Sequence, residues 1–319
     1  MGTVRAAGID CGTNSIRLLV ADVDLATGEV RDVTRLLRLV RLGQGVDATG
    51  RLAPEALART FAAVREYGGI CRDLGVGPVR MVTTSATRDA SNAGEFTDGV
   101  RAILGIDPEV VTGAEEAALS FSGAVGGAYG EAPYLVVDLG GGSTELVVGT
   151  DRVEAAHSMD VGCVRLTERR LRSDPPTAAE LAAATADVDA ALDMAATEVD
   201  LSRTGTVVGV AGTVTSVTAF ALGLRVYDPA RVDGTVLSPR RVMAACEALW
   251  SMSRAERLAL GFLERRRADV IGAGAVVWSR VIRRVDDAVA STGRRLTSII
   301  TSEHDILDGV TLSAVRRKG

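Results

Sequence analysis

Residues 135–148 read LVVDLGGGSTELVV, in which an apolar run ends at Asp138 and a second β-branched run follows Glu145. Three glycines, a serine and a threonine separate the two runs, so the stretch predicts a strand, a tight turn and a second strand. Glycines lack a Cβ and let backbone N–H groups approach an anion closely, and the two hydroxyl groups add donors. The two acids flank the turn, where both could reach a Mg²⁺ that accompanies a phosphate. A Gly-rich hairpin with an acidic edge is the alternative, and this stretch by itself leaves both open.

A second copy of the pattern lies near the N-terminus, where residues 10–20 read DCGTNSIRLLV. Asp10 aligns with Asp138. Ser15 aligns with Ser143, and the apolar residues that follow also align. Two such hairpins predict a duplicated fold with its ligand held between the halves. Neither copy contains the Gly-Lys-Ser/Thr of a P-loop, and a strand rather than a helix follows the glycines. The candidate phosphate-binding residues of the two turns are Gly12, Thr13, Asn14, Ser15, Gly140, Gly141, Gly142, Ser143 and Thr144.

The composition limits the classes of protein to consider. A chain of 319 residues suits about two domains, and 47% hydrophobic residues suffice for substantial cores. The formal net charge of −5 argues against a general nucleic-acid binder. Lys318 is the only lysine, so nearly all the basic residues are arginines. Arginine suits phosphate recognition, although genomic base composition explains so uniform a bias better.

Cysteine, histidine and hydropathy patterns bear on compartment and metal. The four cysteines are far apart and form no CxxC pair, as is typical of reduced thiols in a cytoplasmic protein. We expect neither a secretory peptide nor a membrane span, because Asp10 precedes any apolar signal core and no apolar run reaches about 18 residues. His157 and His304 are the only histidines, which excludes a His-rich metal site. Any metal should therefore have oxygen ligands, and Mg²⁺ is the natural candidate.

The order of predicted elements repeats in the two halves of the chain. Three strands near residues 4–40 precede alternating helices and strands, and three strands near residues 134–159 begin the same order again. This order predicts two related α/β domains joined by the Gly-rich stretch 126–133. The expected ranges are 1–128 for an N-terminal domain, 129–304 for a C-terminal domain, and 305–319 for a closing helix that packs back on the N-terminal domain.

Two side chains outside the turns are candidates for chemistry. Thr112 and Glu115 form a T-x-x-E capping box at the start of a predicted helix, which gives Glu115 a structural task. Glu116 lies about 100° away around the helix and is free of that task, which makes it a candidate general base. A solvated first-turn glutamate is the alternative. Arg88 follows a small-polar stretch after a strand, where its guanidinium could take two phosphate oxygens, although a surface arginine would look the same.

Two further glycine-containing stretches have weaker patterns. Residues 209–213 end a strand and begin a helix, so their amides offer another anion cradle, although a tight strand-to-helix turn explains them nearly as well. Residues 272–275 read GAGA inside a helical pattern and lack the third glycine of a dinucleotide fingerprint. We expect these glycines to serve close helix packing.

Together these stretches resemble the exopolyphosphatase/guanosine pentaphosphate phosphatase family, within the acetate and sugar kinase, heat-shock chaperone and actin superfamily. The matching stretches, in family order, are GIDCGTNSIRLLVADV, TTSATRDASN, TGAEEAALSFSGA, LVVDLGGGSTELVVG, DVGCVRLTE, VAGTVTSVTAF and SEHDILDGV. The resemblance implies an α/β fold of two duplicated actin-like (ribonuclease H-like) domains with a cleft between them. It departs from the family where VAGTVTSV replaces a common Gly-Gly-Thr, which weakens a nucleotide site, and where Leu-Asp-Gly replaces Arg-Glu-Gly near the end.

The resemblance also implies roles for individual residues. The family's catalytic glutamate falls on Glu116, in agreement with the capping pattern, and its phosphate-contacting arginine falls on Arg88. Its Mg²⁺-associated acids fall on Asp138 and Glu145, with Asp10 in the equivalent first hairpin. The implied reaction is Mg²⁺-dependent hydrolysis of the terminal phosphoanhydride of inorganic polyphosphate.

Several further expectations follow from the same resemblance. The chain is similar to the short two-domain form of the family, so we expect it to prefer short polyphosphates. Removal of the 5′ γ-phosphate from guanosine pentaphosphate is the alternative substrate, and a nucleotide-binding sensor or kinase of the same superfamily is the alternative class. We expect a cytoplasmic homodimer with a link to the stringent response and with neither nucleic-acid nor membrane partners.

Overall fold

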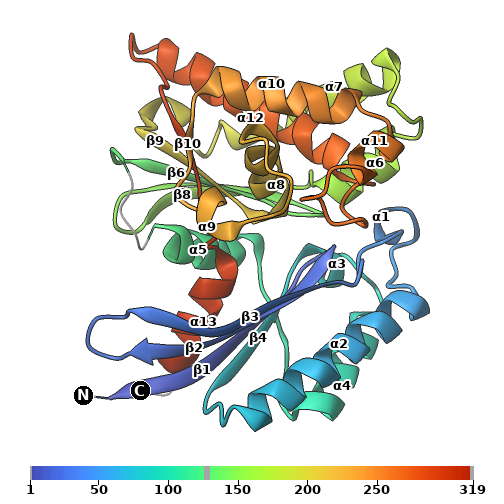
Figure 1. The fold of residues 1–319 in the computed structure, drawn as a ribbon, viewed down its shortest axis with the longest axis vertical. Helices are drawn as coiled ribbons and strands as arrows, with labels where there is room; N and C mark the ends of the chain where they lie inside the picture. Colours follow the sequence, from blue (N-terminus) through green and yellow to red (C-terminus); the bar gives the residue numbers. More distant parts are fainter. Residues whose placement is uncertain (1, 126–129, 317–319) are drawn as a thin grey trace. The chain divides into compact units, whose positions relative to one another are not determined.

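The computed structural model describes residues 2–125 and 130–316, which form two compact α/β units (Figure 1). The first unit comprises residues 1–123 and 306–319, and the second comprises residues 124–305. The chain thus leaves the first unit after α5 and returns to it at α13. The predicted domain boundary at residue 128 lies outside the described residues.

The first unit contains five strands and a set of helices. In chain order they are β1 (Thr3–Cys11), β2 (Ser15–Asp24), β3 (Val30–Leu39), α1 (Val46–Thr49), α2 (Pro54–Asp73), β4 (Val79–Thr83), α3 (Ser85–Arg88), α4 (Ala93–Leu104), β5 (Glu109–Val110), α5 (Gly113–Ala124) and α13 (Ile306–Arg316).

The second unit contains a larger sheet and more helices. These are β6 (Tyr134–Leu139), β7 (Thr144–Gly149), β8 (Val153–Met159), α6 (Cys163–Arg170), α7 (Ala178–Ala195), the 3₁₀ helix η1 (Leu201–Arg203), β9 (Thr206–Val210), α8 (Ala211–Ala221), α9 (Pro229–Val232), β10 (Val236–Leu237), α10 (Pro239–Ser251), α11 (Arg254–Leu258), α12 (Ile271–Ala290) and β11 (Ile299–Thr301).

The two sheets share one topology, which confirms the predicted duplication. The first sheet has the order β3-β2-β1-β4-β5, in which β1, β2 and β3 are antiparallel neighbours and β4 and β5 join in parallel. The second has the order β10-β11-β9-β6-β7-β8, so that β6, β7, β8, β9 and β11 repeat the five-strand arrangement and β10 adds an antiparallel edge. The mixed α/β architecture with two domains is therefore as predicted.

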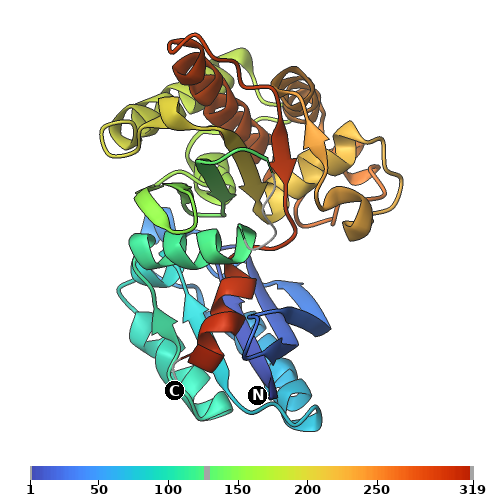
Figure 2. The ribbon, with the colours of Figure 1, turned by 90° about the vertical axis from the view of Figure 1, so that its left-hand side faces the viewer.

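Each face of the first sheet carries its own helices, because successive strand residues point to opposite faces. On β2, Leu18 and Val20 face the core that α2 and α4 cover, whereas Leu19 and Ala21 pack with Leu307 of α13. Helix α13 also contacts β1 and β4. In Figure 2 this helix (red) runs along the sheet of the first unit, next to the strands drawn in blue.

The core of the second unit forms around α12, a long helix with a buried face that includes Trp278. Gly274 in this helix lies against α8, because a Cβ built there would be 2.5 Å from Thr213 Oγ1. The predicted role of the GAGA stretch in close helix packing is thus confirmed. No helix within the described ranges is long and apolar enough to span a membrane.

The cysteines of the described chain are all free and buried, in agreement with the prediction of reduced thiols. Burial raises the pKa of the Cys71 thiol to about 11 and that of Cys11 well above its usual value. A thiol is nucleophilic as the thiolate, so these groups are structural rather than reactive.

Candidate active site

The first predicted phosphate turn joins β1 to β2 and is anchored on two sides. The Gly12 N–H donates to Ser15 O at 2.9 Å and closes the turn. Thr13 Oγ1 lies 2.9 Å from Ser85 Oγ, which ties the turn to α3. The Gly43 N–H donates to Thr13 O at 2.9 Å, and a Cβ at Gly43 would overlap the Thr13 methyl group. The turn therefore has a fixed shape before any ligand binds.

Asn14 stands out in this turn. Its Oδ1 is buried and makes no hydrogen bond to any of the described residues, while its backbone oxygen accepts from Arg41 N–H at 2.9 Å. A buried polar atom without a partner costs free energy, and such atoms in native proteins are commonly satisfied by a ligand or water. This amide oxygen is an acceptor, so a water molecule, a cation or a donor group of a ligand at the turn could satisfy it.

The carboxylate of Asp10 belongs to an ion pair with Arg17, its cross-strand neighbour on β2. Arg17 Nη2 and Nε lie 2.6 Å and 3.0 Å from Asp10 Oδ2, and Asp10 is 4% exposed. The guanidinium offsets the charge of this acid. Arg17 is absent from the predicted site residues, although its place seven residues after Asp10 in a hairpin could have revealed it.

The second predicted turn, between β6 and β7, closes in the same way. The Gly140 N–H donates to Ser143 O at 3.0 Å. The first turn of α6 adds a second anchor, because the Cys163 N–H donates to Gly140 O and the Val164 N–H donates to Gly141 O, at 3.0 Å and 2.8 Å. Gly142 and Thr144 complete this turn, and Thr144 is fully buried.

A pair of facing carboxylates distinguishes the second hairpin from the first. Asp138 and Glu145 are direct cross-strand partners, so both side chains lie on one face of the sheet. Both are buried, at 6% and 1% exposure, and Ser158 Oγ donates to Glu145 Oε1 at 2.7 Å. Where the first hairpin has Arg17, the second has Glu145. Carboxylate oxygens are ligands that hard cations prefer, so these two facing side chains could together hold a cation.

The donor set suits a magnesium ion that arrives with phosphate. Across residues 2–125 and 130–316, no three or more His, Cys, Asp and Glu side chains are grouped to hold a metal ion. Mg²⁺ is bound through one or two carboxylates, and waters and substrate phosphates complete its coordination. The Asp138–Glu145 pair meets that requirement.

The predicted capping role of Glu115 is confirmed. Glu115 Oε2 accepts from the Thr112 N–H at 2.9 Å, and Thr112 Oγ1 accepts from the Glu115 N–H at 3.2 Å. These hydrogen bonds, chiefly the one from the Thr112 backbone, lower the pKa of Glu115. Its carboxylate is thus committed to the start of α5.

Glu116 does not take part in this cap and instead contacts Arg88, the other candidate for chemistry. The Glu116 side chain is 10% exposed, which excludes a freely solvated glutamate. Arg88 Nη1 donates to Glu116 Oε2 at 3.1 Å and to Val111 O at 2.8 Å. The short helix α3 therefore brings Arg88 to the start of α5, and the arginine holds the Glu116 carboxylate in place.

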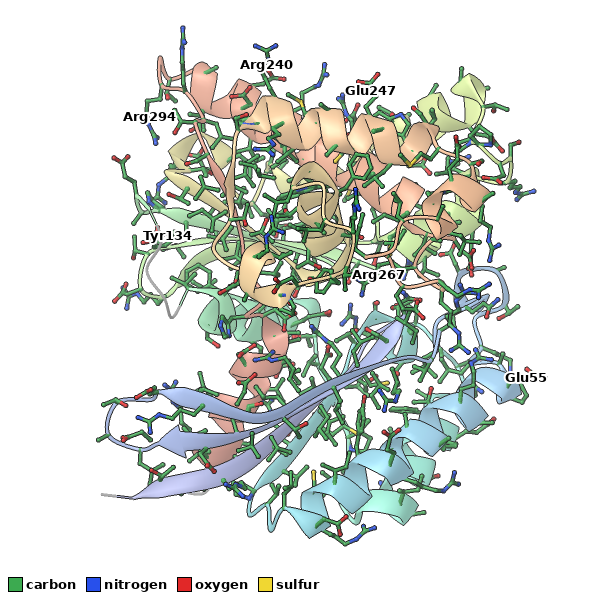
Figure 3. The ribbon with its side chains drawn as sticks, viewed as in Figure 1. Glu55, Tyr134, Arg240, Glu247, Arg267 and Arg294 are labelled. Carbon is green, nitrogen blue, oxygen red and sulfur yellow. The ribbon has the colours of Figure 1, made fainter. Side chains whose placement is uncertain are left out.

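The stretch 209–213 forms a strand-to-helix turn covered by an arginine. The arginine is Arg267, whose side chain is labelled in Figure 3. Its Nη1 donates to Gly212 O at 3.0 Å and to Ser216 Oγ at 3.2 Å. A Cβ at Gly212 would be 2.5 Å from Arg267 Cζ. The guanidinium thus occupies the space next to Gly212. The sequence could not predict which of the three consecutive arginines, 265–267, would contact Gly212.

Ala211, the first residue of α8, has a φ of +68°, which glycine adopts more readily than alanine. We expect Ala211→Gly to stabilise the fold by about 0.5–1 kcal/mol, because relief of the left-handed strain exceeds the entropy cost of glycine. Ala219→Gly in the ordinary part of the same helix should instead destabilise by about 1–2 kcal/mol, because it also removes a buried methyl group. Denaturant unfolding of both variants measures the difference, and equal destabilisation would contradict it.

Comparisons with known proteins assign the chain to the family that the sequence resembles. The family model described as the Ppx/GppA phosphatase family matches residues 19–293, and the chain belongs to this family. Exopolyphosphatase 2 of Mycobacterium tuberculosis (strain CDC 1551 / Oshkosh) is 48% identical over 322 residues, which cover 98% of this chain and 99% of that protein. The predicted family is thus confirmed.

Two solved structures show the same architecture from end to end. The crystal structure of an exopolyphosphatase-like protein aligns with a TM-score of 0.96 at 48% identity and covers 100% of this chain and 99% of its own. The crystal structure of the Aquifex aeolicus member of the Ppx/GppA family aligns with a TM-score of 0.79 at 29% identity and covers 99% of both chains. The duplicated two-domain fold is therefore that of this family.

Proposed function

We propose that this chain is an exopolyphosphatase that hydrolyses the terminal phosphoanhydride of inorganic polyphosphate and releases orthophosphate. The observation that carries the proposal is the buried Glu116, held by Arg88 in the unit that also contains the first phosphate turn. The 48% identity to a protein named exopolyphosphatase 2 supports the substrate. Hydrolysis needs donors, a positioned base and little covalent chemistry, which fits these residues.

In the proposed reaction, Glu116 accepts a proton from water as the water oxygen attacks the terminal phosphorus. The bond between that phosphorus and the bridging oxygen breaks, and the electron pair stays on the shortened chain. Backbone amides and hydroxyl groups of the first turn, residues 12–15, which belong to the same unit as Glu116, bind phosphate oxygens, and phosphate binding by residues 140–144 of the other unit stays a prediction. Arg88 positions Glu116 and adds positive charge where negative charge accumulates.

Asp138 and Glu145 would hold the magnesium ion in this proposal. Mg²⁺ bound there would offset the negative charge of the phosphate oxygens. Asp10, the third predicted metal ligand, contacts Arg17, and we propose that it orients that arginine and the first hairpin instead. We place the protein in the cytoplasm, in keeping with its buried free thiols, and a homodimer and a link to the stringent response stay predictions.

Chain-length analysis of the products tests the proposal. With Mg²⁺ and polyphosphate of defined length, orthophosphate should be the one small product from the first time point onward. Gel electrophoresis of the polymer together with a malachite-green assay measures both products. Fragments of intermediate length without orthophosphate would show internal cleavage and contradict an exopolyphosphatase.

The enzyme should act distributively and favour short chains. A long polyanion is held by many cation–phosphate contacts, each of which adds a little affinity. Arg17 of the first hairpin and Arg88 of α3 already pair with Asp10 and Glu116, and the formal net charge of the chain is −5. On a gel, a long polyphosphate should therefore shorten as one moving ladder. Full-length polymer that persists beside orthophosphate alone would contradict this.

A further inference from the structure

Helix α13 of the first unit supports the segment that carries Glu116. Apolar side chains of α13 form a small buried cluster with residues of β4 and of the 111–119 segment. The cluster consists of Val82, Val111, Leu119, Ile306 and Val310. Val111 and Leu119 lie on either side of Glu116 in the chain, and Val111 O accepts the hydrogen bond from Arg88. The cluster therefore contacts both the start of the segment and the middle of α5.

Helix α13 approaches α5 closely at Gly309. A Cβ built there would overlap the carbonyl oxygen of Leu119 and lie 2.8 Å from Ser122 Oγ. The Leu119 carbonyl is backbone, so a side chain at position 309 has to displace one helix from the other. Leu119 lies within one turn of Glu116 on α5, and a shift there moves Glu116 as well. Figures 1 and 2 both show an end of α13 at α5.

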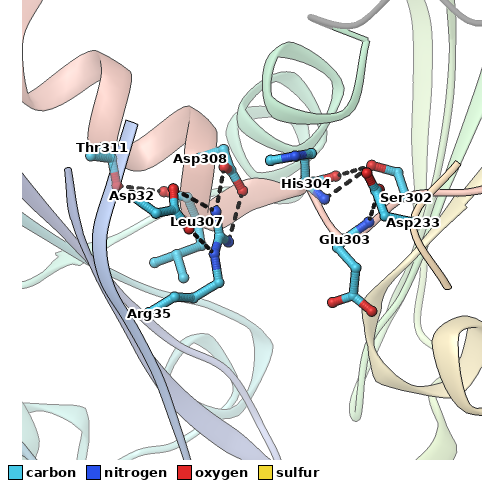
Figure 4. Close-up of polar contacts among 9 residues, drawn as sticks. All are labelled: Asp32, Arg35, Asp233, Ser302, Glu303, His304, Leu307, Asp308 and Thr311. Atoms are coloured by element: carbon cyan, nitrogen blue, oxygen red, sulfur yellow. Dashed lines mark hydrogen bonds and ion pairs between the residues drawn. The ribbon is translucent and has the colours of Figure 1, made fainter. Parts of the chain in front are cut away.

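Contacts with β1 and with Arg35 hold α13 against the sheet. A Cβ at Gly8 of β1 would be 2.9 Å from Thr311 N and 3.1 Å from Leu307 O, so the helix lies directly on the sheet. Arg35 from β3 donates to both carboxylate oxygens of the buried Asp308, at 2.7 Å and 3.1 Å (Figure 4). A displacement at the α13–α5 contact therefore falls on α5.

We propose that α13 sets the position of Glu116 and that Gly309 is the positioning residue through which it does so. This rests on the proposed function, in which Glu116 is the general base. A misplacement of a catalytic group by about 1 Å can cost about 10²-fold in rate. The Arg88–Glu116 contact of 3.1 Å would not survive such a displacement unchanged.

Gly309→Ala tests the proposal, with Gly99→Ala as the matched control. Gly309→Ala should lower kcat on polyphosphate by about 10-fold to 100-fold while KM stays unchanged, because the base moves and the phosphate turns do not. Gly99 lies in α4 of the same unit, and a Cβ there would press on the Phe61 ring, 2.5 Å from Cε1. This control introduces an overlap with a side chain, away from α5, so it should change stability and keep kcat.

Circular dichroism verifies that each variant is folded before its kinetics are compared. Equal kcat for Gly309→Ala and Gly99→Ala would overturn the proposal, as would a loss of activity confined to KM. If Gly309→Ala does not fold, Val310→Ala decides, because it removes part of the cluster without an overlap. It should lower kcat several-fold at constant KM, and an unchanged kcat would overturn the proposal.

The same assays separate this inference from the proposed function. If Glu116→Gln keeps full activity, the assignment of the base is wrong. If Glu116→Gln is inactive while Gly309→Ala and Val310→Ala keep the kcat of the unaltered chain, only the positioning role of α13 is wrong.

Discussion

Glu116→Gln is expected to lower kcat on polyphosphate by about 10²-fold to 10⁴-fold, the usual contribution of a positioned general base. Polyphosphate binding should largely persist, because the amide keeps the shape of the side chain and the phosphate turns are untouched. Steady-state phosphate release gives kcat, and a binding assay with the inactive variant gives the affinity.

Glu115→Gln is the matched control for this change, since it alters the neighbouring residue in the same way. Glu115 caps α5 through Thr112, so its loss should cost about 0.5–2 kcal/mol of stability and leave turnover nearly intact. If both variants lose activity equally, or if Glu115→Gln alone does, Glu116 is not the base.

Asp138→Asn should raise the Mg²⁺ concentration needed for half-maximal activity by about 10-fold or more, because even the outer-shell partners of a metal contribute about 10-fold to 100-fold to its affinity. The substitution removes one of the two facing carboxylates and leaves Glu145 without its partner in holding the cation. A titration of activity with Mg²⁺ after removal of metal by a chelator measures the midpoint.

Asp10→Asn provides the comparison that separates the two hairpins. Asp10 is paired with Arg17, so its substitution should disturb the first hairpin but leave the Mg²⁺ midpoint where it was. If the Mg²⁺ midpoint shifts as far for Asp10→Asn as for Asp138→Asn, Asp10 is also a metal ligand. Full activity in excess chelator would show that the reaction does not need a metal ion.

Local patterns made much of the fold and site predictable. The two hairpins follow from alternating apolar runs around glycines, and their repeated order in the chain led to the duplicated sheets. The capping box between Thr112 and Glu115 is a three-residue spacing, so its structural role could be predicted and that of Glu116 inferred by difference. Interactions between residues near in sequence depend little on the rest of the fold.

The contacts that the sequence did not reveal join distant segments or depend on strand register. The pairing of Asp10 with Arg17 follows from the register of β1 and β2, which motif alignment with Asp138 ignores. The approach of Gly309 to Leu119 brings together residues from widely separated parts of the chain, and no periodicity encodes it. Arg267 is one of three consecutive arginines, and only the tertiary fold places it against Gly212.

Orthophosphate release from three substrates in parallel shows directly whether this chain removes the terminal phosphate from polyphosphate. Polyphosphate, guanosine pentaphosphate and ATP are supplied at equal concentrations with Mg²⁺, and Glu116→Gln serves as the blank. The unaltered chain should release orthophosphate fastest from polyphosphate, and Glu116→Gln should release almost none. Release from a nucleotide alone, or a Glu116→Gln variant as fast as the unaltered chain, would contradict the proposed function.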